Sequence, residues 1–278
     1  MKTTNTFHTQ AAIKPWQLAL GLLAAAGSAQ AHLGYGGRDF GSFSGLASQS
    51  VTIANQAVSG NYGWADATDF NFGDSHKARA FRFHLDNAAT ITLSVAAKAD
   101  ATSTSIGGLL PGFSIYQGLA HLAPQSADHD FSAISTAYLA SLPGEAKEGA
   151  WVATGDWKIG NDGNATYAAE LSSFAFRGYA VDGSAANFSN ANPNVVGDGV
   201  ADGFVSASFA LAAGDYTVMI GGADYWAQNP SNPDLAKTFG LSATLSVAAP
   251  VPEAQSWAMF SLGLGLMGLL TRRRSQRG

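Results

Sequence analysis

Three oxygen-bearing side chains, spaced four residues apart, form the best candidate for a metal site in the sequence. Asn194, Asp198 and Asp202 fall at positions one, five and nine of a calcium-binding loop. Glycines between them permit a sharp bend, and the carboxylates offset the charge of a hard cation. Positions three and twelve are Val196 and Val205, which supply no side-chain ligand. The alternative interpretation is an Asx-rich turn that leads into the next strand.

Histidine suggests a second metal chemistry, with copper as the ion. If cleavage of a signal peptide leaves His32 as the first residue, its amino group and ring Nδ1 can chelate copper, and a second imidazole completes a T-shaped site. Such a site is the one used by copper-dependent polysaccharide oxygenases. The candidate partners are His76, His84, His121 and His129. Alternatively, the N-terminal histidine arises by chance, and His84 is simply an outward-facing strand residue.

Motifs of hydrolytic catalysis and phosphate binding are absent from the sequence, which has no Gly-x-Ser-x-Gly, no His-Glu-x-x-His and no phosphate loop. A carboxylate pair for glycoside cleavage stays open, because it is defined by spacing in the fold. Four aromatic residues are suited either to stacking on sugar rings or to the core: Trp151, Trp157, Tyr225 and Trp226. We therefore expect a non-enzymatic protein, with glycan and calcium as candidate ligands.

Alternating apolar and polar residues predict the strands that must position these side chains. The clearest segments are 80–85, 91–95, 205–211, 216–220 and 241–247, with weaker ones at 50–58 and 113–117. An Asp-Asn turn between the first two predicts a hairpin. Short strands with polar outer faces and glycine-rich turns indicate an all-β fold, an antiparallel β-sandwich of jelly-roll type.

One region interrupts the series of predicted strands. Residues 119–180 are predicted to form an inserted loop and helix region, with the helix running from Ser132 to Leu142. The sequence shows no second domain boundary and no internal repeat, so residues 32–249 are expected to form one domain.

Charge and cysteine content exclude several classes of function. The chain has 15 basic and 20 acidic residues. The two removable ends hold six of the basic residues and one of the acidic ones, which leaves nine against nineteen, or a net charge of −10. This balance argues against nucleic acid as a partner. Without cysteine, the chain has no disulfide, thiolate ligand or cysteine nucleophile, as suits an exported protein.

The first thirty-one residues have the organisation of a secretory signal peptide. Lys2 and Lys14 form a basic region, residues 16–26 an apolar region, and Ala29-Gln-Ala31 a cleavage site made of small residues. The mature chain is therefore expected to begin at His32.

The C-terminal segment, residues 250–278, contains a short box, an apolar run and a basic cluster. Pro252, Glu253 and Ala254 precede an uncharged stretch, 256–271, which is expected to form a membrane helix of about 24 Å. Arg272, Arg273 and Arg274 follow it and would keep its end on the cytoplasmic side.

This order of features resembles the sorting signal of the PEP-CTERM proteins of Gram-negative bacteria. The resemblance implies recognition by a processing protease, an exosortase, a transient anchor in the inner membrane, and an association with exopolysaccharide. The box of that family is usually Pro-Glu-Pro, and Ala254 departs from it. The strands at 80–95, 113–116 and 211–218 also resemble, in their cadence, the jelly-roll modules of the pre-peptidase C-terminal type.

Together these features predict an exported, non-enzymatic protein of the envelope or extracellular matrix that is sorted through its C-terminal signal. The alternative is a copper-binding protein or copper-dependent polysaccharide oxygenase that uses His32.

Overall fold

The computed structural model describes residues 33–65, 72–120, 131–132, 150–160, 172–188 and 195–249, together with Leu262, Leu264 and Met267. The chain divides into a unit of residues 1–30 and a unit of residues 31–278, and all described residues belong to the second.

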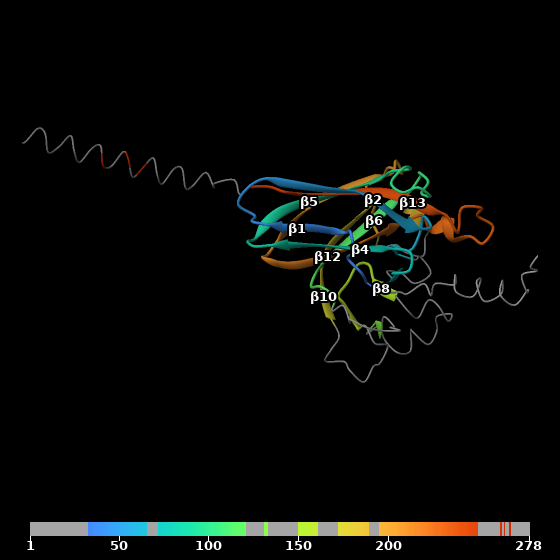
Figure 1. The fold of residues 1–278 in the computed structure, drawn as a ribbon, viewed down its shortest axis with the longest axis horizontal. Coiled ribbons are helices and arrows are strands. Elements are labelled where there is room, and N and C mark those ends of the chain that lie inside the picture. Colours follow the sequence, from blue (N-terminus) through green and yellow to red (C-terminus); the bar gives the residue numbers. More distant parts are fainter. Residues whose placement is uncertain are drawn as a thin grey trace, which may run out of the picture. The chain divides into compact units, whose positions relative to one another are not determined.

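Two β-sheets make up most of the described chain (Figure 1). The larger sheet has the order β1 (Asp39–Phe43), β4 (Arg79–Leu85), β12 (Gly214–Gly222), β6 (Pro111–Gln117), β10 (Ser172–Val181), β9 (Trp157–Gly160) and β7 (Phe131–Ser132). The smaller sheet has the order β11 (Phe204–Leu211), β5 (Ala89–Ala97), β13 (Thr238–Val247) and β2 (Gln49–Ser59). β3 (Phe72–Asp74) pairs with β8 (Ala150–Val152), and two short helices, α3 (Ala185–Phe188) and η4 (Tyr225–Gln228), complete the set.

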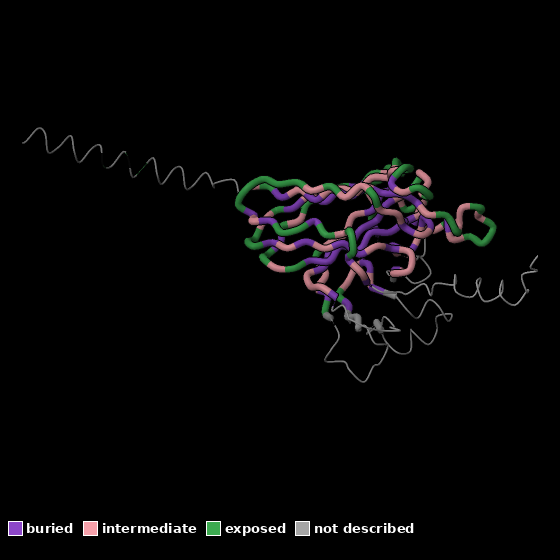
Figure 2. Tube along the Cα trace, viewed as in Figure 1, coloured by how far each residue is buried: buried purple, intermediate pink, exposed green. Residues whose placement is uncertain are grey.

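The prediction of an all-β sandwich is confirmed. All strand pairs are antiparallel except β1 with β4, and one apolar cluster fills the space between the two sheets. Each contributing strand turns alternate residues toward this core, as the buried segments of Figure 2 illustrate. The predicted strands lie within β4, β5, β11, β12, β13, β2 and β6.

The predicted hairpin between residues 80–85 and 91–95 is wrong. β4 pairs with β1 and β12, whereas β5 pairs with β11 and β13 in the other sheet. The chain therefore crosses between the sheets at residues 86–88, and apolar residues of both strands enter the same core: Phe81, Phe83, Leu85, Ile91, Leu93 and Val95. Alternation identifies the buried face of a strand, but it does not identify the neighbouring strand.

A second apolar cluster covers part of the outer face of the larger sheet. Its members from the sheet include Tyr116 of β6 and Met219 of β12, and it also contains Trp64 from a loop and Trp151 from the short strand β8. The strands β6 and β12 are consequently buried on both faces, so their burial does not alternate.

Residues 119–180, predicted as an insertion, supply strands of the larger sheet. β10 pairs with β6 along Ala175–Val181, and β9 and β7 extend the sheet beyond it. The predicted helix begins at Ser132, which lies in β7, and residues 133–142 lie outside the described residues.

Most of the predicted C-terminal helix, residues 256–271, lies outside the described residues, although Leu262, Leu264 and Met267 are helical. Within the described part of the chain, no helix has the length and apolar character needed to cross a membrane.

Candidate functional site

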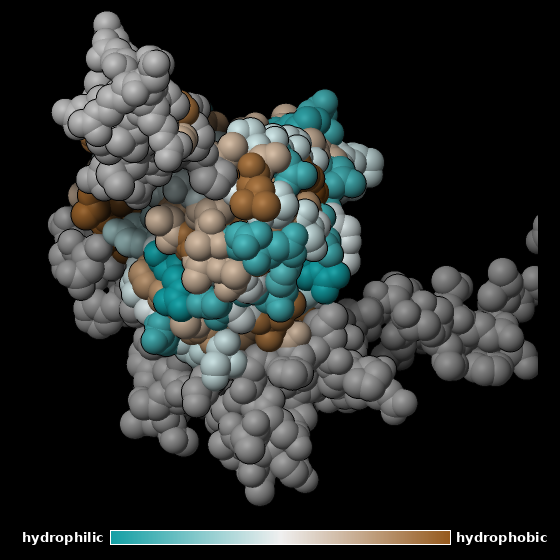
Figure 3. All heavy atoms as spheres, turned by 90° about the vertical axis from the view of Figure 1, so that its left-hand side faces the viewer, coloured by the Kyte–Doolittle hydropathy of each residue, from teal (hydrophilic) through white to brown (hydrophobic). Residues whose placement is uncertain are grey.

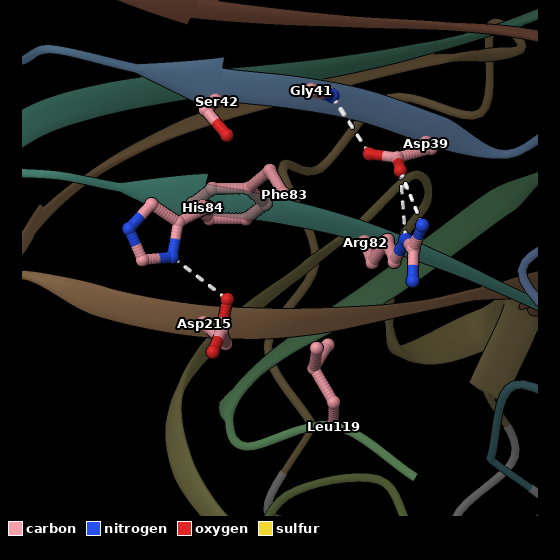
Figure 4. Close-up of a pocket in the computed structure, with 8 residues that line it drawn as sticks. All are labelled: Asp39, Gly41, Ser42, Arg82, Phe83, His84, Leu119 and Asp215. Atoms are coloured by element: carbon pink, nitrogen blue, oxygen red, sulfur yellow. Dashed lines mark hydrogen bonds and ion pairs between the residues drawn. The ribbon is translucent and has the colours of Figure 1, made fainter. Parts of the chain in front are cut away.

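A polar groove of about 330 Å³ lies across three neighbouring strands of the larger sheet (Figure 4). Register places Ser42 of β1 opposite His84 of β4, and His84 opposite Asp215 of β12. One step along the same strands, Asp39 lies opposite Arg82. Side chains on one face of adjacent strands are close neighbours, so the sheet itself assembles this row of polar groups.

Three side-chain pairs organise the groove, and His84 takes part in two of them. His84 Nδ1 lies 2.7 Å from Asp215 Oδ1, and His84 Nε2 lies 3.4 Å from Asp86 Oδ1. Arg82 Nε and Nη2 contact Asp39 Oδ2 at 2.8 and 2.7 Å. These groups are partly exposed, so each pair contributes about 0–1 kcal/mol to stability. The groove therefore offers a fixed polar surface and adds little to the stability of the sheet.

The groove contains a serine, a histidine and an aspartate, but they do not form a nucleophilic relay. Such a relay needs the serine hydroxyl hydrogen-bonded to the imidazole nitrogen that faces away from the aspartate. In the described part of the chain that nitrogen, His84 Nε2, approaches Asp86, and no hydrogen bond joins Ser42 to His84. The arrangement suits binding of a polar group better than acyl transfer.

Sequence reasoning identified His84 as an outward strand residue but missed Asp39 and Ser42. Both belong to β1, a five-residue strand with a register shift between Asp39 and Ser42 and a glycine at position 41 with positive φ. This bulge disrupts the period-two pattern, so alternation could not reveal the strand. The Asp39 carboxylate accepts a hydrogen bond from the Gly41 amide, a local turn signal that the sequence does contain.

The predicted calcium loop gains no support. Asp198 Oδ1 accepts hydrogen bonds from the amides of Gly183 and Val200, and Asp202 Oδ1 accepts one from Phe204. The contacts to Val200 and Phe204 are Asx-turn contacts, the contact to Gly183 ties two loops together, and all three carboxylate contacts are to the backbone. Asn194 lies outside the described residues.

The histidines proposed as copper partners are not gathered at one place in the described chain. His76 Nδ1 contacts Asp74 at 2.9 Å, and His84 lies in the groove. His32, His121 and His129 lie outside the described residues. Among described residues, no group of three or more histidine, aspartate or glutamate side chains is arranged to hold a metal ion.

The four candidate aromatic residues separate into two pairs. Trp151 and Trp157 are buried in the second apolar cluster, so they belong to the core. Tyr225 is half-buried, and Trp226 is 60% exposed on η4.

The residues of the two terminal signals lie outside the described residues. These are Ala29, Ala31, Pro252, Glu253, Ala254, Arg272, Arg273 and Arg274. Their roles stay predictions from the sequence.

Several solved structures are distantly similar to this chain, among them two copper-binding proteins. The first structure is CorA, described as a surface-associated copper-binding protein important in Methylomicrobium album BG8 copper acquisition; it is 17% identical, with a TM-score of 0.41, over 76% of this chain and 98% of CorA. The second is the secreted protein MopE of Methylococcus capsulatus, in which an oxidized tryptophan facilitates copper binding; it is 15% identical, with a TM-score of 0.42, over 77% of this chain and 87% of MopE. No curated protein matches the chain in sequence.

A family model described as the PEP-CTERM protein-sorting motif matches residues 250–274. The match includes the Pro252-Glu253 box, the apolar run and the three arginines. A sorting motif of this kind implies export and processing by an exosortase at the membrane. By this match, the chain carries a PEP-CTERM sorting motif at residues 250–274.

Proposed function

We propose that this protein is an exported, non-enzymatic β-sandwich that is delivered by its C-terminal signal to the cell envelope or extracellular matrix and binds glycan there. The proposal rests on the position at which the folded sandwich ends. β13 ends at Val247, and the next two amides still bond to the sandwich, Ala248 to Thr90 O at 3.0 Å and Ala249 to Ser48 Oγ at 3.1 Å. The sorting motif starts at residue 250. Processing beyond Ala249 therefore leaves every described strand in place.

Each part of the signal has a separate task in this proposal. The Pro252-Glu253 box is the feature that the exosortase recognises. The apolar run 256–271 holds the chain transiently in the inner membrane, and the arginines keep its end on the cytoplasmic side. The sandwich faces outward throughout.

The groove supports a binding role over a catalytic one. Its polar groups are occupied in pairs, and Ser42 has no hydrogen bond to the imidazole that would activate it in the described structure. Binding requires only that these groups are held in place, and the strand register holds them there.

Cell fractionation tests the sorting step. We expect replacement of Pro252 and Glu253 by alanine to leave an unprocessed, membrane-bound precursor, detected as a larger band in the membrane fraction. Gln255→Ala is the matched control, because it changes the same segment outside the box. Normal processing and location of the doubly substituted protein would remove the sorting role of the box.

Copper binding at His32 is the second candidate function. Leu33, the next residue, is only 2% exposed and packs in the second apolar cluster, so a chain that starts at His32 would be anchored from its second residue onward. A fixed terminus favours chelation, because less conformational entropy is lost on binding. Mass spectrometry of the mature N-terminus and copper titration of the exported protein test this idea. A different first residue, or equal copper binding by His32→Ala, would exclude it.

A further inference from the structure

Trp226 presents its ring to solvent in an arrangement that core packing does not explain. The other tryptophans in the described chain, Trp64, Trp151 and Trp157, are at most 5% exposed, whereas Trp226 is 60% exposed. Tryptophan usually buries its ring and leaves its N–H at the wet end. Trp226 instead exposes its ring, while its Nε1 donates a hydrogen bond to the backbone carbonyl of Ala186 at 2.8 Å.

The exposed ring is held in one orientation from several sides. The Asp224 carboxylate caps η4 and accepts a hydrogen bond from the Trp226 amide at 3.1 Å. The Tyr225 ring packs edge-on against the indole, with centroids 5.1 Å apart and planes at 75°. The Asn232 amide donates to the carbonyl of Ala227 at 3.0 Å and ties the following turn to the helix. A ring fixed in advance loses little entropy when a ligand stacks on it.

The short helix that carries this ring also carries polar side-chain groups that are free to bond a ligand. Within the described chain, neither the Tyr225 hydroxyl nor the Gln228 side-chain amide has a hydrogen-bond partner. A flat apolar face beside free donors and acceptors matches a sugar ring, which has an apolar C–H face and a rim of hydroxyl groups. We call Tyr225, Trp226 and Gln228 the aromatic platform.

We propose that the aromatic platform binds a neutral polysaccharide by stacking a sugar ring on Trp226. The inference rests on the proposed function and names the site of its glycan binding. Charge favours a neutral glycan over an acidic one. The only lysine or arginine between Asp224 and Lys237 is Lys237 itself, and its Nζ is paired with Asp234 at 2.6 Å. No free cation of this segment is left for a uronate or sulfate, and the mature chain is itself acidic.

The size of the platform also favours a sugar over a protein partner. A tryptophan that is 60% exposed offers on the order of 100 Å², since a whole aromatic side chain buries about 150–250 Å². A stable protein interface needs about 800 Å² from each partner. One stacked ring with a few hydrogen bonds fits a weak, repeated interaction along a polymer.

Affinity electrophoresis of the exported protein tests the site. The gels contain hydroxyethylcellulose, galactomannan or dextran as neutral polymers, and alginate as the acidic one. We expect retardation by at least one neutral polymer and none by alginate. Trp226→Ala should weaken the retardation about tenfold, since the stacking surface is lost, and Trp226→Phe should retain part of it.

The control separates this site from other exposed apolar side chains and from sorting. Leu46→Ala removes a comparably exposed apolar side chain, 68% exposed, from a loop distant in sequence and should bind normally. Lack of binding to every neutral polymer, equal binding by Trp226→Ala, or Trp226-dependent binding to phosphatidylcholine vesicles instead would overturn the proposal. None of these results depends on where the protein is sorted, which fractionation measures separately.

Discussion

Asp182 shows how one buried carboxylate fixes the loop before β11. The residue is fully buried at the end of the larger sheet, and its two oxygens accept hydrogen bonds from the amides of Asp202 and Gly203 at 3.1 and 2.7 Å. Burial is the main cause that raises the pKa of Asp182, and the neighbouring Asp198 and Asp202 act in the same direction, while the two amides oppose them. The carboxylate is thus costly to ionise in the folded chain.

This pKa shift predicts a dependence of stability on pH. Because the pKa of Asp182 is higher in the folded than in the unfolded chain, its contribution to the free energy of unfolding is fully present below about pH 3.9, the pKa of an unperturbed aspartate, and is lost as pH rises through the folded pKa. The unfolding free energy of the wild type relative to Asp182→Asn should therefore fall with rising pH. Urea unfolding of both proteins at a series of pH values from about 3 to 7 measures this difference in unfolding free energy.

Asp100 provides a control, because its pKa is shifted in the opposite direction to that of Asp182. A hydrogen bond from Lys98, with its positive charge, lowers the pKa of this exposed carboxyl. Its contribution is therefore present above the unfolded pKa and is lost as pH falls through the folded pKa. Asp100→Asn should show a difference from wild type that grows with pH. The same trend for Asp182→Asn would contradict our assignment.

At the scale of secondary-structure elements, the sequence predicted which segments form strands better than it predicted how those strands pair. Strands β4, β5, β11 and β13 each bury alternate residues and were predictable for that reason. β10 was not, although Phe174 is buried within it, because a register shift between Phe176 and Gly178 breaks the alternation along this strand. The crossing between β4 and β5 was missed because both strands have one polar face in either topology.

The candidate sites, like the strand pairs, could be predicted only where their contacts are local in sequence. The acidic turn at Asp198 is local, and its Asx contacts could be predicted as the alternative to calcium binding. The groove depends on three strands that are far apart in sequence, so Ser42 and Asp215 become neighbours of His84 only through sheet register. Sequence also could not separate Trp226 from Trp151, because exposure is decided by the loops that cover the sheet.

Close contact between β12 and the loop after β2 predicts a strong effect of one added methyl group. A Cβ at Gly222 would lie 2.1 Å from the carbonyl carbon of Asn61 and 2.4 Å from the nitrogen of Tyr62. These are backbone atoms that a rotamer change cannot move, and the loop also carries buried Trp64. We expect Gly222→Ala to lower the free energy of unfolding by about 1–3 kcal/mol.

Gly36→Ala is the matched control for this overpacking. A Cβ at Gly36 meets nothing within 4 Å. The variant should unfold within about 1 kcal/mol of wild type, with any change toward greater stability because the unfolded chain loses freedom. Urea denaturation compares the two variants, and equal midpoints would show that the loop at Asn61 yields to the added methyl group.

At the scale of the whole molecule, the second apolar cluster covers part of the outer face of the larger sheet, and the smaller sheet has an open polar outer face. Hydroxyl pairs line that open face between neighbouring strands, such as Thr52 with Thr244 at 2.8 Å and Thr92 with Ser208 at 2.7 Å. The end of the sandwich in Figure 3 likewise mixes hydrophilic residues with isolated apolar ones. An exported protein with such surfaces needs a separate sorting signal, and the C-terminal motif provides it.

The separation of fold and address predicts that the tail can be removed without loss of stability. A chain that ends at Ala249 keeps β13 and its bonds to Thr90 and Ser48. Its melting temperature should match that of the full exported chain within about 2–4 °C, the shift expected for 1 kcal/mol in a domain of this size. A chain that ends at Lys237 lacks β13, which lies between β5 and β2, and should not fold. Circular dichroism melts of the two truncated proteins measure this contrast. A large fall in melting temperature for the Ala249 truncation would mean that the C-terminal segment is part of the folded domain, and the signal could then not be a removable address.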